Sequence, residues 1–180
     1  ILEGVNRIPA ETVFVLPNNG NIIMAAQQCS GLTEKHVVVI PTKTVPQGIT
    51  AMMNVDFEAP DADTITEAMT GSLSSVTTAQ ITYAARDSDF DGFAIREGDY
   101  LALEEGKLFG TDPSIDALLE KLADQAMARS AEFVSLYFGE DVSEEDARRA
   151  SEIFQARCPE SEVAVLSGGQ PVYYYIISME

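Results

Sequence analysis

The chain reads Thr12-Val-Phe-Val-Leu-Pro17-Asn18-Asn19-Gly20-Asn21 and then, after an intervening stretch, His36-Val-Val-Val-Ile-Pro41-Thr42-Lys43-Thr44. Each half is a short apolar run that stops at a proline and is followed by polar residues. Such runs are typical of strands buried in a parallel sheet. Loops at the carboxyl ends of these strands are where open α/β sheets usually meet ligands and partners. The two stretches therefore predict an α/β fold and indicate where to look for its function.

The composition is that of a globular, strongly acidic protein. Of 180 residues 46% are hydrophobic, and 29 acidic against 11 basic residues leave a formal charge of −18. This charge repels phosphate backbones and anionic lipids, which argues against nucleic acid and membrane partners. No apolar run approaches the roughly 20 residues that span a bilayer, and the first residues do not resemble a signal peptide. Two distant cysteines favour a reduced, cytoplasmic protein.

The order of elements predicts two similar strand-loop-helix-strand lobes joined by a β-rich middle segment. The first α/β lobe covers residues 12–71 and the second covers residues 113–180. Residues 72–112 carry several short strand patterns between glycine-containing turns, so we expect them to connect the lobes. Residues 1–11 read as the tail of a preceding region. Because the chain starts at an isoleucine and not a methionine, we expect it to be a fragment of a longer protein.

Local signals predict several helix boundaries. Asn21 is a candidate N-cap, and Pro46 is suited to the first turn of a short helix. Apolar residues at helical spacing predict a helix over residues 114–129. Ser143 and Asp146 have the spacing of a capping box, which predicts that a helix begins there.

The asparagines after the first strand are candidate binding residues. Asn18, Asn19 and Asn21 supply side-chain amides that could hydrogen-bond to the backbone of a partner. Asparagine also tolerates left-handed backbone and caps helices, so a purely structural role explains the same residues.

The loop after the second strand is a candidate anion site. Thr42, Lys43, Thr44 and Gln47 offer hydroxyls, an ammonium group and an amide beside the start of a helix, a combination suited to phosphate or carboxylate. The alternative is a rigid connection in which Thr44 caps the helix and Lys43 lies in solvent.

The corresponding loop of the second lobe contains Gly169 and Gln170. Its glycines would allow close approach by another chain, but they also suit a tight turn. A final strand is expected over residues 172–177. Because side chains alternate along a strand, at least one of its three tyrosines, residues 173–175, is expected to point outward. An exposed tyrosine is a good interface anchor, and a buried tyrosine with a hydrogen-bonded hydroxyl is the alternative.

The middle segment contains Asp87-Ser-Asp89-Phe-Asp91-Gly92, which spells half of a calcium loop. The motif requires a carboxylate at its twelfth position and flanking helices, whereas Gly98 occupies that position and strands are expected on both sides. An acidic turn is the alternative, with Arg86 and Asp87 forming an ion pair at the strand end.

Signals for catalysis are weak. A single histidine, His36, excludes multi-histidine zinc sites, and no phosphate-binding glycine loop is present. Cys29 and Cys158 are expected on apolar helix faces, where an inert, packed thiol is the usual state.

Four stretches together resemble the C-terminal region of the fatty acid kinase A protein, a family also described as dihydroxyacetone kinase-like. They are LPNNGNIIMAAQQ, VVVIPTKTVPQGITAM, ITYAARDSDFDGFAIREGDYLAL and GGQPVYYYIISME. The resemblance extends from about Thr12 to Glu180. It implies a parent phosphotransferase whose missing kinase domain uses ATP and Mg²⁺, and a DegV-type partner that presents a bound fatty acid for phosphorylation.

In that arrangement this region is a noncatalytic docking module that holds no cofactor and contacts the DegV-type protein and its own kinase domain. The asparagine, Thr-Lys-Thr and Gly-Gly-Gln loops would form its recognition edge. Two alternatives remain open. One is a site for a small anion or acyl phosphate at residues 42–47. The other is a structural role in which the region shapes or dimerises the parent.

Overall fold

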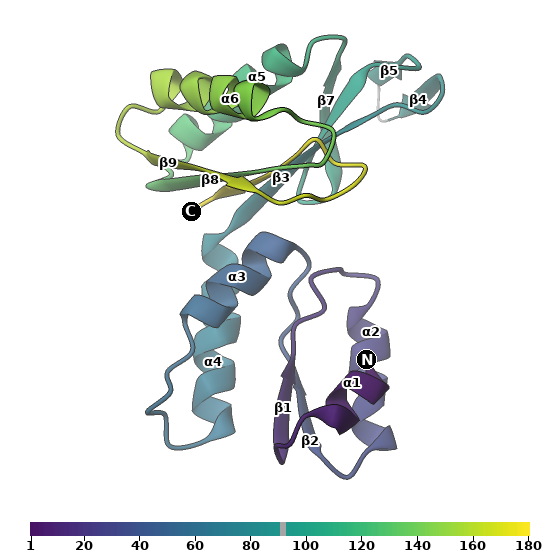
Figure 1. Ribbon diagram of the computed structural model, residues 1–180, viewed down its shortest axis with the longest axis vertical. Coiled ribbons are helices and arrows are strands. Elements are labelled where there is room, and N and C mark those ends of the chain that lie inside the picture. Colours follow the sequence, from purple (N-terminus) through teal and green to yellow (C-terminus); the bar gives the residue numbers. More distant parts are fainter. Residues whose placement is uncertain (91–92) are drawn as a thin grey trace. The chain divides into compact units, whose positions relative to one another are not determined.

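The computed structural model describes residues 1–90 and 93–180. The chain divides into two compact units, Ile1–Val76 and Thr77–Glu180. Helices and strands occur in both, which confirms the predicted α/β class (Figure 1).

The first unit is built around two parallel strands. It contains α1 (Leu2–Arg7), β1 (Thr12–Val15), α2 (Ile23–Gln28), η1 (Cys29–Leu32), β2 (His36–Val39), α3 (Val45–Met53), α4 (Ala62–Ser72) and η2 (Leu73–Ser75). Thr12 lies opposite His36 and Val15 opposite Val39, so the predicted parallel pairing is confirmed. Helices α1 and α2 lie on one side of this pair, and α3 and α4 lie on the other (Figure 1).

The core of the first unit lies between the strands and the α3–α4 pair. Ile40, Ala51 and Met69 are almost completely buried there, and side chains from both strands and from α4 pack against them. Helix α1 also belongs to this unit, with Val5 buried. The segment 1–11 thus contributes a helix to the unit that follows it.

In this unit α3 begins where the sequence signals predicted, and α2 does not. Thr44 is the N-cap of α3, its hydroxyl accepts a hydrogen bond from the Gln47 N–H, and Pro46 lies in the first turn, as predicted. The expected cap at Asn21 is wrong. Helix α2 begins one residue later than this cap requires, with Ile22 at its N-cap and no side-chain cap bond.

The second unit is a six-stranded sheet covered on one face by two helices (Figure 1). Its sheet order is β7-β6-β3-β10-β8-β9, and every neighbouring pair is antiparallel except the parallel pair β8–β9. The elements are β3 (Thr77–Tyr83), β4 (Ser88–Phe90), β5 (Phe93–Ile95), β6 (Tyr100–Glu104), β7 (Lys107–Asp112), α5 (Ile115–Ala128), β8 (Phe133–Phe138), α6 (Glu144–Arg157), β9 (Glu162–Ser167) and β10 (Tyr175–Met179). Strands β4 and β5 form a separate two-stranded ribbon.

The core of this unit lies between the sheet and its two helices. The apolar stripe of α5, with Leu118, Leu119 and Leu122 fully or almost fully buried, faces the sheet as its spacing predicts. Helix α6 begins at the predicted capping box, where the Ser143 hydroxyl accepts a hydrogen bond from the Asp146 N–H at 3.1 Å.

The middle of the chain differs from the expected connector. Residues 72–112 include β3, β6 and β7, which occupy half of the sheet that β8, β9 and β10 complete. The cause is long-range pairing, because the last strand of the chain inserts between β3 and β8. The predicted strand-helix-strand repeat nevertheless has a physical counterpart, since β1–β2 and β8–β9 are both parallel pairs.

The final strand is shorter than predicted. It begins at Tyr175, and the three preceding residues form an irregular turn in which Val172 has φ 71°. Of the three tyrosines Tyr175 is buried and Tyr173 and Tyr174 are half-buried, so none of them is a fully exposed interface anchor. Tyr174 packs edge-to-face on Tyr83 and Tyr100 instead.

Candidate functional site

The loops that follow β1 and β2 are joined by a partly buried hydrogen bond. The Asn18 N–H donates to the Thr42 hydroxyl at 2.9 Å, and the Thr42 side chain has no exposed surface. Both residues lie just beyond the carboxyl ends of the parallel strands, where the sequence placed the recognition loops. The structure therefore brings the asparagine loop and the Thr-Lys-Thr loop together in the first unit.

Gln47 forms hydrogen bonds within the loop that follows β2. Its side-chain oxygen accepts the Lys43 N–H at 2.8 Å, and its own N–H donates to the Thr44 hydroxyl at 3.3 Å. The Gly48 N–H in turn bonds to the Thr44 carbonyl. Because these N–H groups are already paired, the start of α3 offers few of the free donors on which anion binding at a helix end depends.

The Asn18 side chain lies directly over Gly48. Asn18 has φ 54°, and a Cβ at Gly48 would come within 2.2 Å of Asn18 Oδ1. Among the described residues Asn18 Oδ1 is buried without a hydrogen-bond partner. Because this oxygen is covered by Gly48, it is an unpaired acceptor inside the first unit, and its partial negative charge disfavours an anion nearby.

An exposed apolar stripe runs along α3 beside this loop pair. Val45, Ile49 and Met52 recur at the i, i+4, i+7 spacing of one helix face and are 47%, 37% and 54% exposed. Met53, the last residue of α3, is 80% exposed, and Phe57, which follows the helix, is 90% exposed. The sequence reasoning missed this stripe, although its spacing was visible. We call the surface formed by these five residues the α3 stripe.

The other first-unit candidates lie in solvent. Asn19, Asn21 and Lys43 are exposed, and the Asn21 N–H donates to the Asn19 side chain at 2.9 Å. Lys43 extends its stem toward Gly20, whose hypothetical Cβ would lie 3.9 Å from Lys43 Cγ. These side chains are accessible to a partner.

The four remaining candidates belong to the second unit. Gln170 is used internally, since its amide donates to the Tyr137 carbonyl at 2.9 Å and to the Tyr173 carbonyl at 3.2 Å. Gly169 has φ 61°, which glycine adopts without strain. The Gly-Gly-Gln loop is thus held by its own glutamine.

Arg86 and Asp87 follow β3 and are both exposed. The Asp87 carboxylate accepts the Glu97 N–H at 2.7 Å, so it closes the base of the β4–β5 ribbon. Asp91 and Gly92 of the candidate calcium loop lie outside the described residues. Within residues 1–90 and 93–180 no three His, Cys, Asp or Glu side chains gather to hold a metal.

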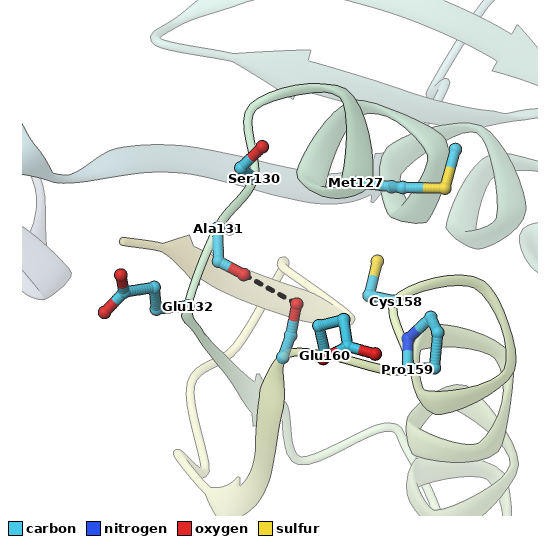
Figure 2. A pocket seen from close by; sticks show the side chains of 8 residues that line it. Met127, Ser130, Ala131, Glu132, Cys158, Pro159 and Glu160 are labelled. Atoms are coloured by element: carbon cyan, nitrogen blue, oxygen red, sulfur yellow. Dashed lines mark hydrogen bonds between the residues drawn. The ribbon is translucent and has the colours of Figure 1, made fainter.

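A cavity of about 300 Å³ lies where β8 and β9 begin, at the other end of these strands from the Gly-Gly-Gln loop (Figure 2). Met127 and Cys158 line it at the carboxyl ends of α5 and α6, and the Ser161 hydroxyl donates to the Ala131 carbonyl at 2.6 Å along its wall. The carboxylates of Glu132 and Glu160 add negative charge to the negative ends of two helix dipoles. This cavity is therefore unsuited to a fatty acid carboxylate.

Both thiols are buried, as the sequence predicted. Burial raises the pKa of the Cys158 thiol, which donates to the Ala123 carbonyl at 3.2 Å. A protonated, hydrogen-bonded thiol is a packing group and a poor nucleophile.

Solved structures with the same fold are DegV-family proteins. The Streptococcus pneumoniae fatty acid kinase B3 protein, loaded with linoleic acid, aligns with a TM-score of 0.70 at 11% identity, over 99% of this chain and 74% of that one. A DegV family protein from Eubacterium eligens, loaded with heptadecanoic acid, aligns with a TM-score of 0.72 at 15% identity, over 99% and 75%. At such low identity the likeness establishes the fold alone, so the chain has an α/β fold like that of DegV-family proteins.

The chain belongs to the FakA-like C-terminal family, the C-terminal domains of fatty acid kinase A-like proteins, whose family model matches residues 1–180. Protein YloV of Bacillus subtilis (strain 168) is 37% identical over 182 residues, covering all of this chain and 32% of that protein. An uncharacterised protein of Staphylococcus aureus (strain USA300) is 30% identical over 180 residues and is 33% covered. The chain thus spans about a third of the length of these curated relatives. No helix among the described residues is both long and apolar enough to cross a bilayer.

Proposed function

We propose that this domain is the noncatalytic docking module of a cytoplasmic fatty acid kinase, and that it receives a DegV-type protein carrying the fatty acid. The family supports the reaction, in which a separate kinase domain would use ATP and Mg²⁺ to phosphorylate the carried acid. The observation that carries the proposal is the α3 stripe, an apolar surface next to accessible loop amides.

The α3 stripe has the chemistry of an interface core. Methionine and aromatic side chains are enriched in such cores, and a few of them usually provide most of the binding energy. Met52, Met53 and Phe57 are each more than half exposed, so their apolar side chains contribute little hydrophobic free energy to the folding of this chain. A partner that covers them would recover the hydrophobic free energy.

The adjoining loops provide preorganised polar contacts. The bond from Asn18 to Thr42 and the contacts of Gln47 hold the two loops in one conformation before any partner arrives. A surface that is already ordered loses less conformational entropy on binding. The exposed amides of Asn19 and Asn21 then remain available for hydrogen bonds across the interface.

The net charge indicates the complementary surface. A chain with a formal charge of −18 attracts a basic partner face and accelerates its association at low ionic strength. We therefore expect the DegV-type protein to present lysine or arginine side chains around an apolar patch.

The test is a calorimetric titration of this chain with a purified, lipid-loaded DegV-type fatty-acid-binding protein from the same source. The double variant Met52→Ser/Phe57→Ser should weaken binding at least about tenfold, which corresponds to ~1.4 kcal/mol. The matched control is Met127→Ser/Phe133→Ser, which removes one exposed methionine and one exposed phenylalanine from the second unit. Absence of saturable binding by the unchanged chain would reject docking. Equal losses in both double variants would reject this surface.

A small-anion site at residues 42–47 is the weaker candidate. Lys43 is the only basic residue in the loop, while the N–H groups of Lys43, Gln47 and Gly48 bond within the loop and helix. Saturable binding of inorganic phosphate or a fatty acyl phosphate, lost in Lys43→Ala, would favour it over docking.

A further inference from the structure

Strand β9 forms one edge of the six-stranded sheet and pairs with β8 on one side only (Figure 1). Its residues are Glu-Val-Ala-Val-Leu-Ser, so a single charge lies at its first position. Val163 and Val165 point toward the core, while Ala164 and Leu166 are exposed on the opposite face. The strand is therefore apolar on both faces as well as open at its edge.

The open edge carries unpaired backbone groups. The N–H groups of Glu162 and Gly168 bond to the Glu132 and Phe138 carbonyls in the β8 segment. Because alternate residues of a parallel strand bond to the same neighbour, the peptide groups of the intervening odd-numbered residues point away from β8. These are Val163, Val165 and Ser167, and none of the described residues pairs with their peptide groups.

A groove of about 550 Å³ runs between this edge and α6. Val163, Val165 and Phe138 form its floor, and Ala147 and Ser151 form part of its helical wall. Ala147 and Ser151 are small, which leaves room for a side chain beside the strand, while the longer Glu144 and Arg148 side chains also line the groove. An added strand at this edge would extend the sheet and close the groove.

Strand β7 forms the opposite edge of the sheet, and unlike β9 it is protected against pairing with another strand. Strand β7 begins with Lys107 and ends with Asp112, its pairing with β6 has a register shift at Ala102–Leu103, and β5 packs against it. Charged ends, irregular pairing and covering segments are the usual means of blocking edge-to-edge association. Because β9 has only a terminal glutamate, its edge is suited to receive a strand.

We propose that two copies of this chain associate through antiparallel pairing of their β9 strands about Val165. In this register Ala164 lies opposite Leu166 of the second copy, and Val163 lies opposite Ser167 of the second copy. Glu162 falls opposite Gly168 of the second copy, so no like charges meet in the ladder. The strand is thus self-complementary, which is what a two-fold interface requires.

Sedimentation velocity of the 180-residue chain, over micromolar to millimolar concentrations, tests the pairing. We expect a monomer–dimer equilibrium that strengthens from 0.05 M to 0.5 M salt, since salt screens the repulsion between two acidic chains. Val165→Pro removes an outward N–H without breaking the β8 ladder and should weaken the dimer at least tenfold. Val165→Thr keeps the N–H and nearly the same shape, and should weaken it far less.

Amide hydrogen exchange provides a readout on the unchanged chain. Protection of the Val163, Val165 and Ser167 amides should rise with protein concentration, while the Ala164 and Leu166 amides, which face β8, should change little. A chain that stays monomeric at all concentrations would overturn the proposal, whether β9 then stays open or takes a strand of another protein. A dimer whose Val163, Val165 and Ser167 amides exchange at the monomer rate would overturn it as well.

Discussion

The N–H of Asn18 donates to the buried hydroxyl of Thr42 at 2.9 Å, and this bond ties together the loops that follow β1 and β2. The two residues are 24 positions apart in sequence. Their hydrogen bond holds the two loops together as one ordered surface beside the α3 stripe. Loss of this bond should therefore lower the stability of the first unit.

Thr42→Val should destabilise the chain by about 1–3 kcal/mol. Valine has nearly the same shape, but it leaves the partly buried Asn18 N–H without its acceptor, and an unpaired donor that is shielded from water costs about that much. Urea unfolding measures the change. Thr70→Val, at an exposed position of α4, is the matched control and should have little effect. Equal stability of the Thr42 variant and the unchanged chain would contradict the bond's role.

Gly48→Ala should also destabilise, although alanine normally stabilises a helix by roughly 0.5–1 kcal/mol relative to glycine. The reason is steric, since the new Cβ would come within 2.2 Å of Asn18 Oδ1. Gly71→Ala in α4 has open space around it and should show the ordinary stabilisation. Adding Asn18→Gly should rescue the Gly48 variant, because glycine accepts the φ of 54° and removes the clashing amide. Simple additivity of the two changes, measured by thermal unfolding, would reject the contact.

Gln170→Ala should cost about 1–2 kcal/mol of stability, since two backbone carbonyls lose a donor. Gln155→Ala, at an exposed site on α6, should change stability little. If the Gln170 variant were as stable as the Gln155 variant and yet lost partner binding, the recognition role predicted from the sequence would replace this structural one.

Stability should fall with rising pH above about pH 10, and Tyr175 should account for part of the fall. Burial raises the pKa of Tyr175 to about 12 from the ordinary value of 10.0. Between these values the unfolded phenol loses its proton while the folded one keeps it, so the unfolded state binds fewer protons. Stability then decreases by up to ~1.4 kcal/mol per pH unit.

Tyr175→Phe retains the buried ring and should flatten this pH dependence, as measured by urea midpoints from pH 9 to 12. Burial also raises the pKa of Tyr174, so Tyr174→Phe serves as a comparison. An unchanged slope in the Tyr175 variant would show that its phenol ionises freely in the folded state.

Local signals predicted most elements of this chain correctly. The apolar runs at residues 12–16 and 36–40 form a parallel pair, and the helix over residues 114–129 has its stripe against the sheet. Each of these depends on side-chain periodicity within one element, which a sequence displays directly. The cap at Asn21 failed because several residues of that loop can start a helix, and neighbouring contacts decide among them.

The candidate site was predicted less completely. The sequence located the loops of Asn18 and Thr42, but the hydrogen bond between them could not be read from either loop alone. Gln170 appeared available for recognition, and the structure shows both of its donor bonds turned inward. The α3 stripe was visible as spacing, yet which face of a helix stays exposed depends on what packs against it.

The amino-acid sequence by itself determined the α/β class, the positions of nearly all helices and strands, and the family. The tertiary structure decided the order of the sheet, in which the last strand lies between β3 and β8 and leaves β9 at an edge. The physical reason is the range of the interactions. Periodicity and capping act over a few residues, whereas strand order is set by hydrogen-bond ladders and core packing between distant segments, such as those of Thr77 and Met179.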